Sequence, residues 1–266
     1  MRHHIDSFMV NLSVKLPFVS SEGDPDDDDC WKDIGGDIPR SAVPAKLRYL
    51  CRLLQRSYSL GVKIERFYVT DTEDGRTQHR RIKLSREMIH ALAMHGSDFS
   101  YGVFSPFFHS SRCAVDGYYV LRFSQKYEAI FQRFADEKMR DFDVFPCRFG
   151  KVPYVIFDAD EDGLEYFLRG VADLLPNPGR NILLQMDYFT NGSWCWPELE
   201  SETIEALDRM HASVSIEVHP NMGNRTGDRS VPLWRHVFRM ARTSFKAAAS
   251  ASSQSPPSSR SRETRA

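Results

Sequence analysis

The sequence has little of several features that commonly identify a class of protein. Its five cysteines are widely spaced and never form a Cys-x-x-Cys pair, which argues against a disulfide framework and against a structural zinc site. No apolar run approaches the roughly 18 to 20 residues that cross a bilayer. No internal repeat of fixed period is visible either, so the sequence gives no sign of a repeat architecture.

A large net charge is also missing. The chain has 35 basic and 36 acidic side chains, for a formal charge of -1, so no overall field draws it to nucleic acid or to an anionic membrane. The small net charge is the sum of two opposite regional charges. In residues 246–266, four basic side chains against one acidic side chain give +3, which leaves -4 for residues 1–245. We therefore expect no membrane association and no general binding of nucleic acid.

The N-terminus lacks the apolar core of a secretory signal, because Asp6 and several polar residues interrupt it. Unpaired, scattered cysteines fit a reducing compartment. Together these features predict a cytoplasmic protein.

The chain nevertheless contains enough apolar material for a folded core. Of its 266 residues, 41% are hydrophobic and 12% are aromatic, which excludes disorder as the overall state. Two segments differ from the rest. Residues 22–29 are an acidic run that predicts a solvated loop, and residues 246–266 have the composition of a disordered, basic, Ser/Ala-rich tail.

Periodicity predicts several elements in the first half. Alternation of apolar residues favours a strand within residues 5–17, and helical spacing favours helices over 44–60 and 85–95. Ser85 and Gly96 are suited to begin and end the second helix.

A β-hairpin is expected next to these helices. Residues 62–70 and 78–84 are both rich in strand formers, and the turn signal at Gly75 separates them. Residues 97–116 give no assignment.

Strand and helix patterns alternate in the second half of the chain. Strands are predicted at residues 118–123, 152–157, 182–189 and 214–218. Between them lie a helix capped by Ser124, a helix at 164–175 and a helix capped by Ser201, and a last helix is predicted at 231–245. This order predicts an α+β fold with an α/β-like second half, in which helices pack on a mixed sheet. We expect one compact body of two subdomains, residues 1–117 and 118–245, followed by the tail 246–266.

Carboxylates follow the predicted strand at residues 152–157, and ligands favour the carboxyl ends of strands in α/β layers. The segment 155–160, Val-Ile-Phe-Asp-Ala-Asp, resembles the first motif of the haloacid dehalogenase-like phosphatases. Thr190-Asn191-Gly192 resembles the second motif of that family. The resemblance implies a magnesium-dependent phosphotransferase with Asp158 as nucleophile and Asp160 as acid/base. Thr190 would then bind phosphoryl oxygens, and Asp228 would be a further carboxylate of the site.

The chain departs from that pattern at Asp162, where the family has a threonine or a similar small residue, and it has no lysine between Thr190 and Asp228. A simpler interpretation is that Asp158, Asp160 and Asp162 stabilise a helix N-terminus, by about 0.3–1 kcal/mol each. We adopt this interpretation as the expectation. It predicts no metal site and no cofactor, with magnesium entering only under the phosphotransferase alternative.

Other polar groups are also expected to be structural. Ser213, Ser215, Glu217 and His219 share one face of a predicted strand, but without a nucleophile elbow they are typical of the polar face of an amphipathic strand. Cys195 is expected to be a buried, inert thiol.

Aromatic residues surround the turn Asn191-Gly192-Ser193. Tyr188, Trp194 and Trp196 combine large apolar surfaces with a flexible polar turn, which suits a protein interface and equally a corner of the core. The expected function is non-catalytic binding of a protein partner, with a bacterial toxin-neutralising immunity protein as one hypothesis. The magnesium-dependent phosphotransferase is the alternative.

Overall fold

The computed structural model describes residues 10–15, 31–33, 40–72, 80–104, 115–139, 144–149, 152–158, 161–175, 181–190 and 194–220. The predicted acidic loop, the predicted helix at 231–245 and the predicted tail lie outside these residues. The chain up to Arg225 belongs to one compact unit.

The α-helices of the described residues lie in five segments. They are α1 (Val43–Ser59), α2 (Arg86–His95), α3 (Glu128–Lys138), α4 (Glu161–Ala172) and α5 (Ser201–Arg209). None of these described helices is long and apolar enough to cross a membrane.

The strands form two mixed sheets. Sheet A contains β1 (Val10–Lys15), β2 (Trp31–Asp33), β3 (Arg66–Thr72), β5 (Asp98–Phe104), β10 (Trp194–Cys195) and β11 (Glu198–Leu199). Sheet B contains β4 (Arg80–Leu84), β6 (Val115–Arg122), β7 (Val144–Phe149), β8 (Val152–Asp158), β9 (Leu183–Thr190) and β12 (Ser213–Pro220).

The strand order is β10-β5-β3-β1-β2 in sheet A, with β11 also on β5, and β4-β12-β9-β6-β8-β7 in sheet B. In the described residues, β3 pairs with β5 and β9 pairs with β12 in parallel, while the other pairs are antiparallel. Mixed sheets with packed helices confirm the predicted α+β fold.

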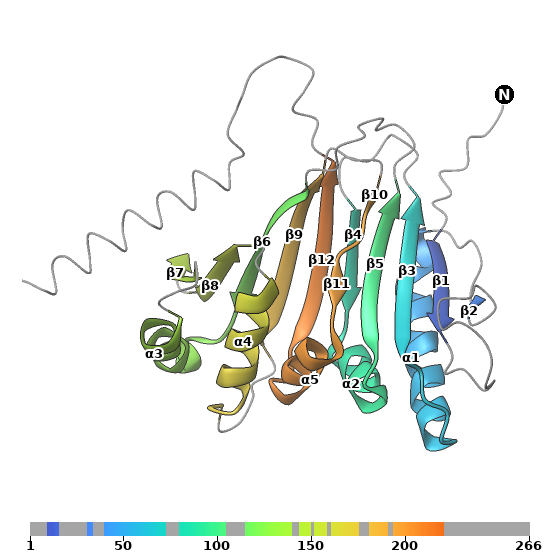
Figure 1. Ribbon diagram of the computed structural model, residues 1–266, viewed down its shortest axis with the longest axis horizontal. Coiled ribbons are helices and arrows are strands. Elements are labelled where there is room, and N and C mark those ends of the chain that lie inside the picture. The colour runs from blue at the N-terminus through green and yellow to red at the C-terminus, as the bar shows by residue number, and fades with distance from the viewer. Residues whose placement is uncertain are drawn as a thin grey trace, which may run out of the picture. The chain divides into compact units, whose positions relative to one another are not determined.

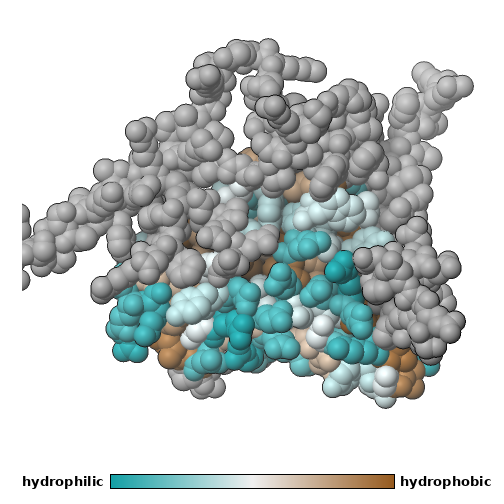
Figure 2. Space-filling model, in the orientation of Figure 1, coloured by the Kyte–Doolittle hydropathy of each residue, from teal (hydrophilic) through white to brown (hydrophobic). Residues whose placement is uncertain are grey.

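The helices lie side by side in the order α1, α2, α5, α4, α3, each packed against the next, and Figure 1 shows this row along the sheets. One hydrophobic core joins all five helices to both sheets. On β4, Ile82 and Leu84 belong to this core, Arg80 is buried on the same face, and the residues between them are exposed. Figure 2 shows a surface that is largely hydrophilic over the helices.

The local signals for α2 are confirmed. The Ser85 hydroxyl accepts a hydrogen bond from the Met88 backbone N–H, as an N-cap does. Gly96 follows the helix with φ of 61°, the left-handed conformation that glycine adopts without a steric penalty.

The predicted hairpin is wrong. β3 lies in sheet A between β1 and β5, whereas β4 lies at the edge of sheet B beside β12. The turn signal at Gly75 is local, but the partner of a strand depends on which edge and which buried face are available.

Two predicted caps are also corrected. Neither Ser124 nor Ser201 makes a side-chain cap. The Ser201 backbone N–H instead donates to the carboxylate of Asp98 at 2.8 Å. A residue of β5 therefore satisfies the first turn of α5, and this long-range bond replaces the local one.

The unassigned segment 97–116 supplies all of β5 and the first residues of β6. Both sheets draw strands from each side of the boundary predicted between residues 117 and 118, because β4 pairs with β12 and β11 pairs with β5.

Candidate functional site

The face of sheet B opposite the core carries a group of polar side chains. On β12, Val214, Ile216 and Val218 point into the core, so the strand period of two places Ser215, Glu217 and His219 on the other face. The predicted polar face of this strand is therefore present. The side chains on the neighbouring strands determine which chemistry this polar face can support.

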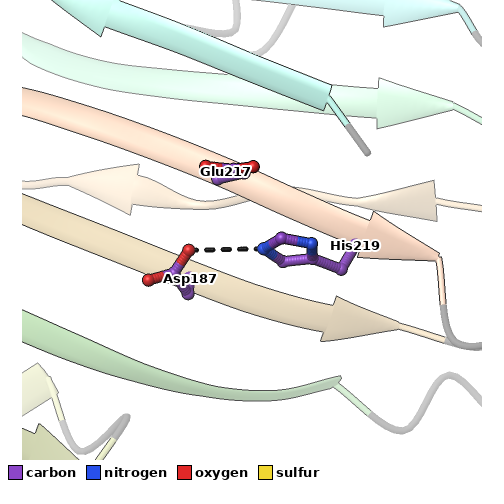
Figure 3. A group of neighbouring side chains, drawn as sticks. All are labelled: Asp187, Glu217 and His219. Atoms are coloured by element: carbon purple, nitrogen blue, oxygen red, sulfur yellow. Dashed lines mark hydrogen bonds and ion pairs between the residues drawn. The ribbon is translucent and has the colours of Figure 1, made fainter. Parts of the chain in front are cut away.

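Parallel pairing sets β9 beside this face. Asp187 pairs with Glu217, and Phe189 pairs with His219. The Nε2 atom of His219 lies 3.3 Å from Oδ1 of Asp187. One ligand atom from each of Asp187, Glu217 and His219 lies within 4.8 Å of the others. Figure 3 shows the three side chains on the neighbouring strands β9 and β12. We call these three residues the carboxylate–histidine cluster.

Asp187 is the buried member, with 3% of its side chain exposed. Its Oδ2 atom accepts a hydrogen bond of 2.7 Å from the Gln185 amide. Burial, followed by the charge of Asp187 and a hydrogen bond with it, raises the pKa of Tyr118 to about 12. Tyr118 therefore stays protonated beside Asp187 at neutral pH.

His219 is oriented by an aromatic neighbour. Its ring stacks on Phe189 with centroids 4.8 Å apart and planes 15° from parallel. Phe189 in turn stacks on Tyr118. Because 28% of the His219 side chain is exposed, the ring is fixed on one side and open to solvent on another.

Glu217 is held by a basic side chain from β4. Arg81 Nε lies 3.8 Å from the Glu217 carboxylate and donates to the Ser215 hydroxyl at 2.9 Å. The guanidinium thus engages both residues. The Ser215 hydroxyl faces Arg81, a cation that cannot act as a general base.

A second feature is on sheet A, where Trp196 joins β10 to β11. Its ring covers Gly102 so closely that a Cβ at that position would overlap it. The ring also makes an edge contact with Tyr68, with centroids 6.4 Å apart. Even so, Trp196 is 43% exposed.

A pocket of about 340 Å³ lies where α1 meets both sheets. Its lining is mainly apolar and includes Val43, Pro44, Leu47, Val69, Asp71, Arg81, Ile82, Lys83 and Tyr101.

The residues predicted to bind a partner occupy different places. Tyr188 is buried, and its hydroxyl lies 2.9 Å from that of Tyr119, so its ring belongs to the core. Trp194 pairs with Phe104 in sheet A. Trp196 alone of the three has a described side chain at the surface. Cys195 is buried, as predicted.

The residues of the phosphotransferase alternative are only partly described. Asp158 ends β8 and Thr190 ends β9, with β6 antiparallel between them. Asp158 pairs with Tyr118, whereas Thr190 pairs with Val115, three residues away along β6. Asp160 and Asp228 lie outside the described residues.

Sequence reasoning missed Asp187, Gln185 and Tyr118. A signal was present, because Gln185 and Asp187 interrupt an apolar strand with the same period of two as Glu217 and His219. Pairing of the two strands was needed to bring them together.

No family model, curated protein or solved structure matches this chain.

Proposed function

We propose that this chain is a non-catalytic binding protein that contacts a protein partner through Trp196. The observation that carries the proposal is a large aromatic ring that is fixed in place and still 43% exposed. Tryptophan is enriched among residues that dominate binding energy at interfaces.

The surroundings of Trp196 support this role. The Tyr101 backbone N–H donates to the Pro197 carbonyl at 2.8 Å, and Cys195 and Leu199 pair with β5 on either side. Contact with Gly102 and Tyr68 restrains the ring. A side chain that is ordered before binding loses less conformational entropy when a partner covers it.

The test is co-purification from native cells with the tagged full-length chain. We expect one protein in stoichiometric amount with the wild type, and at least tenfold less of it with Trp196→Ala. Tyr166→Ala is the matched control, because Tyr166 is similarly exposed on α4 and its loss should leave the yield unchanged. Equal recovery with Trp196→Ala, or no stoichiometric protein with the wild type, would contradict the proposal.

The immunity hypothesis is narrower. It requires the recovered partner to be toxic when expressed alone and harmless when expressed together with this chain. Protection that persists with Trp196→Ala, or a partner without toxicity, rejects it and leaves the broader binding proposal to its own test.

The alternative is a magnesium-dependent phosphotransferase. Asp158 does end a strand shortly before a helix, as the resemblance implies. However, antiparallel β6 and β7 flank β8, so the carboxyl end of β8 is not shared with a neighbouring strand. Hydrolysis of a phosphomonoester that needs magnesium and disappears with Asp158→Asn would favour this alternative.

A further inference from the structure

We propose that the carboxylate–histidine cluster binds one divalent transition-metal ion of the zinc type, with Asp187, Glu217 and His219 as ligands. The inference concerns sheet B and is independent of the role proposed for Trp196.

The ligand spacing is the first argument. Ligands about 2.0–2.2 Å from a tetrahedral zinc ion lie roughly 3.3 Å from each other. The Asp187 and His219 atoms are 3.3 Å apart, and a Glu217 oxygen lies within 4.8 Å of both. A change of the Glu217 side-chain torsions would close the remaining distance.

Burial of charge is the second argument. Asp187 is 3% exposed and is hydrogen bonded with two neutral groups, the Gln185 amide and the Tyr118 hydroxyl. A buried carboxylate is costly unless a cation balances it. Arg81 contacts Glu217, and the imidazole of His219 lies against Oδ1 of Asp187. A metal ion held between these groups would balance the buried carboxylate.

The neighbours orient the three ligands in the way that outer residues do at metal sites. Gln185 engages Oδ2 of Asp187, which leaves Oδ1 on the side of His219. Phe189 holds the plane of the imidazole. Arg81, itself bonded to Ser215, restrains Glu217.

The donor set selects the class of metal. One imidazole and two carboxylates suit zinc, cobalt or manganese, whereas magnesium prefers oxygen ligands and retains its waters. Three protein ligands leave a coordination position for water or for a group of a bound molecule. Glu217 and His219 are both partly exposed, so that position can face solvent.

The experiment is calorimetric titration of the metal-stripped full-length chain with zinc chloride and separately with magnesium chloride. We expect one zinc ion per chain, and magnesium affinity at least 100-fold weaker. Because loss of residues around a metal already costs 10–100-fold in affinity, Asp187→Asn and His219→Ala should each weaken zinc binding on the order of 100-fold or more. Bound cobalt should give visible absorption that both variants lose.

His90→Ala is the matched control. The Nδ1 atom of His90 lies 3.0 Å from Asp208, and among the described residues this exposed carboxylate–imidazole pair has no third ligand beside it. Its loss should leave zinc affinity unchanged. His219→Ala and Glu217→Gln decide the matter if Asp187→Asn does not fold.

Absence of saturable one-to-one zinc binding overturns the proposal. Zinc binding that survives both His219→Ala and Glu217→Gln, or that is lost equally with His90→Ala, also overturns it. Neither result affects the test on Trp196.

Discussion

Asp71 in sheet A and Asp187 in sheet B are both buried carboxylates, and a tyrosine hydroxyl contacts each of them. Tyr101 donates to Asp71 at 3.0 Å, and Tyr118 is hydrogen bonded with Asp187. They differ in the cation beside them. Asp71 lies 3.7 Å from the fully buried guanidinium of Arg80, whereas Asp187 faces the partly exposed ring of His219.

The difference separates a structural pair from an adaptable one. Arginine keeps its charge at all relevant pH values, so the charge of Asp71 is always balanced, and the pair joins β3 of sheet A to β4 of sheet B. An imidazole nitrogen has a lone pair that can bind a metal ion, whereas a guanidinium has none. This contrast is why we propose the metal site at Asp187 and not at Asp71.

The largest expected effect is from Arg80→Met. Removing one partner of a buried ion pair leaves the other charge uncompensated and costs about 3–5 kcal/mol. Urea unfolding measures the free energy. Arg81→Met is the control on the same strand, because Arg81 is 40% exposed and should cost about 1 kcal/mol or less. Similar losses for the two variants would show that Asp71 does not need its cation.

Asp187→Asn should have a smaller effect on stability, about 1–2 kcal/mol in the metal-free chain, because one charge-assisted hydrogen-bond network is weakened without stranding a buried cation. Asp71→Asn, which strands Arg80, should cost at least twice as much. Asp173→Asn, at an exposed ion pair with Arg209, should change stability by about 0.5 kcal/mol or less. Equal costs at Asp71 and Asp187 would remove the distinction between them.

The smallest effect concerns alkaline pH. The pKa of Tyr118 is raised from 10 to about 12, first by burial and then by Asp187, so the folded chain retains a proton that the unfolded chain releases. The contribution of Tyr118 to stability is therefore complete below pH 10 and is lost as pH rises towards 12. Unfolding of metal-free wild type and Tyr118→Phe across this range should show the wild type losing stability faster. Parallel pH profiles would contradict the raised pKa.

Local signals predicted much of the fold. The Ser85 cap, the Gly96 terminus and the apolar spacing of α1 and α2 act within one or two helical turns, and all of these are confirmed. Long-range choices were not predicted. Strand β4 pairs with β12, and Asp98 caps α5 from another strand. Glycine is unfavourable inside a strand, so Gly102 weakens the sequence signal for β5. The structure gives the reason for a glycine there, because a Cβ at this position would overlap the ring of Trp196.

The candidate site was predictable only in part. Alternation on β12 placed Glu217 and His219 on one face, but Asp187 joins them through strand register, which a single sequence does not specify. Trp196 was proposed as a contact residue from its neighbours in sequence, and the same argument selected Tyr188, which faces the core. The position of a residue near a turn in the sequence does not determine on which face of the sheet its side chain lies.

The pairing of β4 with β12 also affects the order of folding. Roughly 130 residues separate these strands along the chain, and synthesis at about 5–20 residues per second delays the arrival of β12 by about 7–26 seconds. Until then β4 lacks the strand that it pairs with in the described part of the chain, and the sheet around Arg80 is incomplete. A nascent chain must therefore keep β4, with the apolar side chains of Ile82 and Leu84, unpaired while the residues up to β12 are being made. This interval is the period when aggregation or a chaperone competes with native assembly.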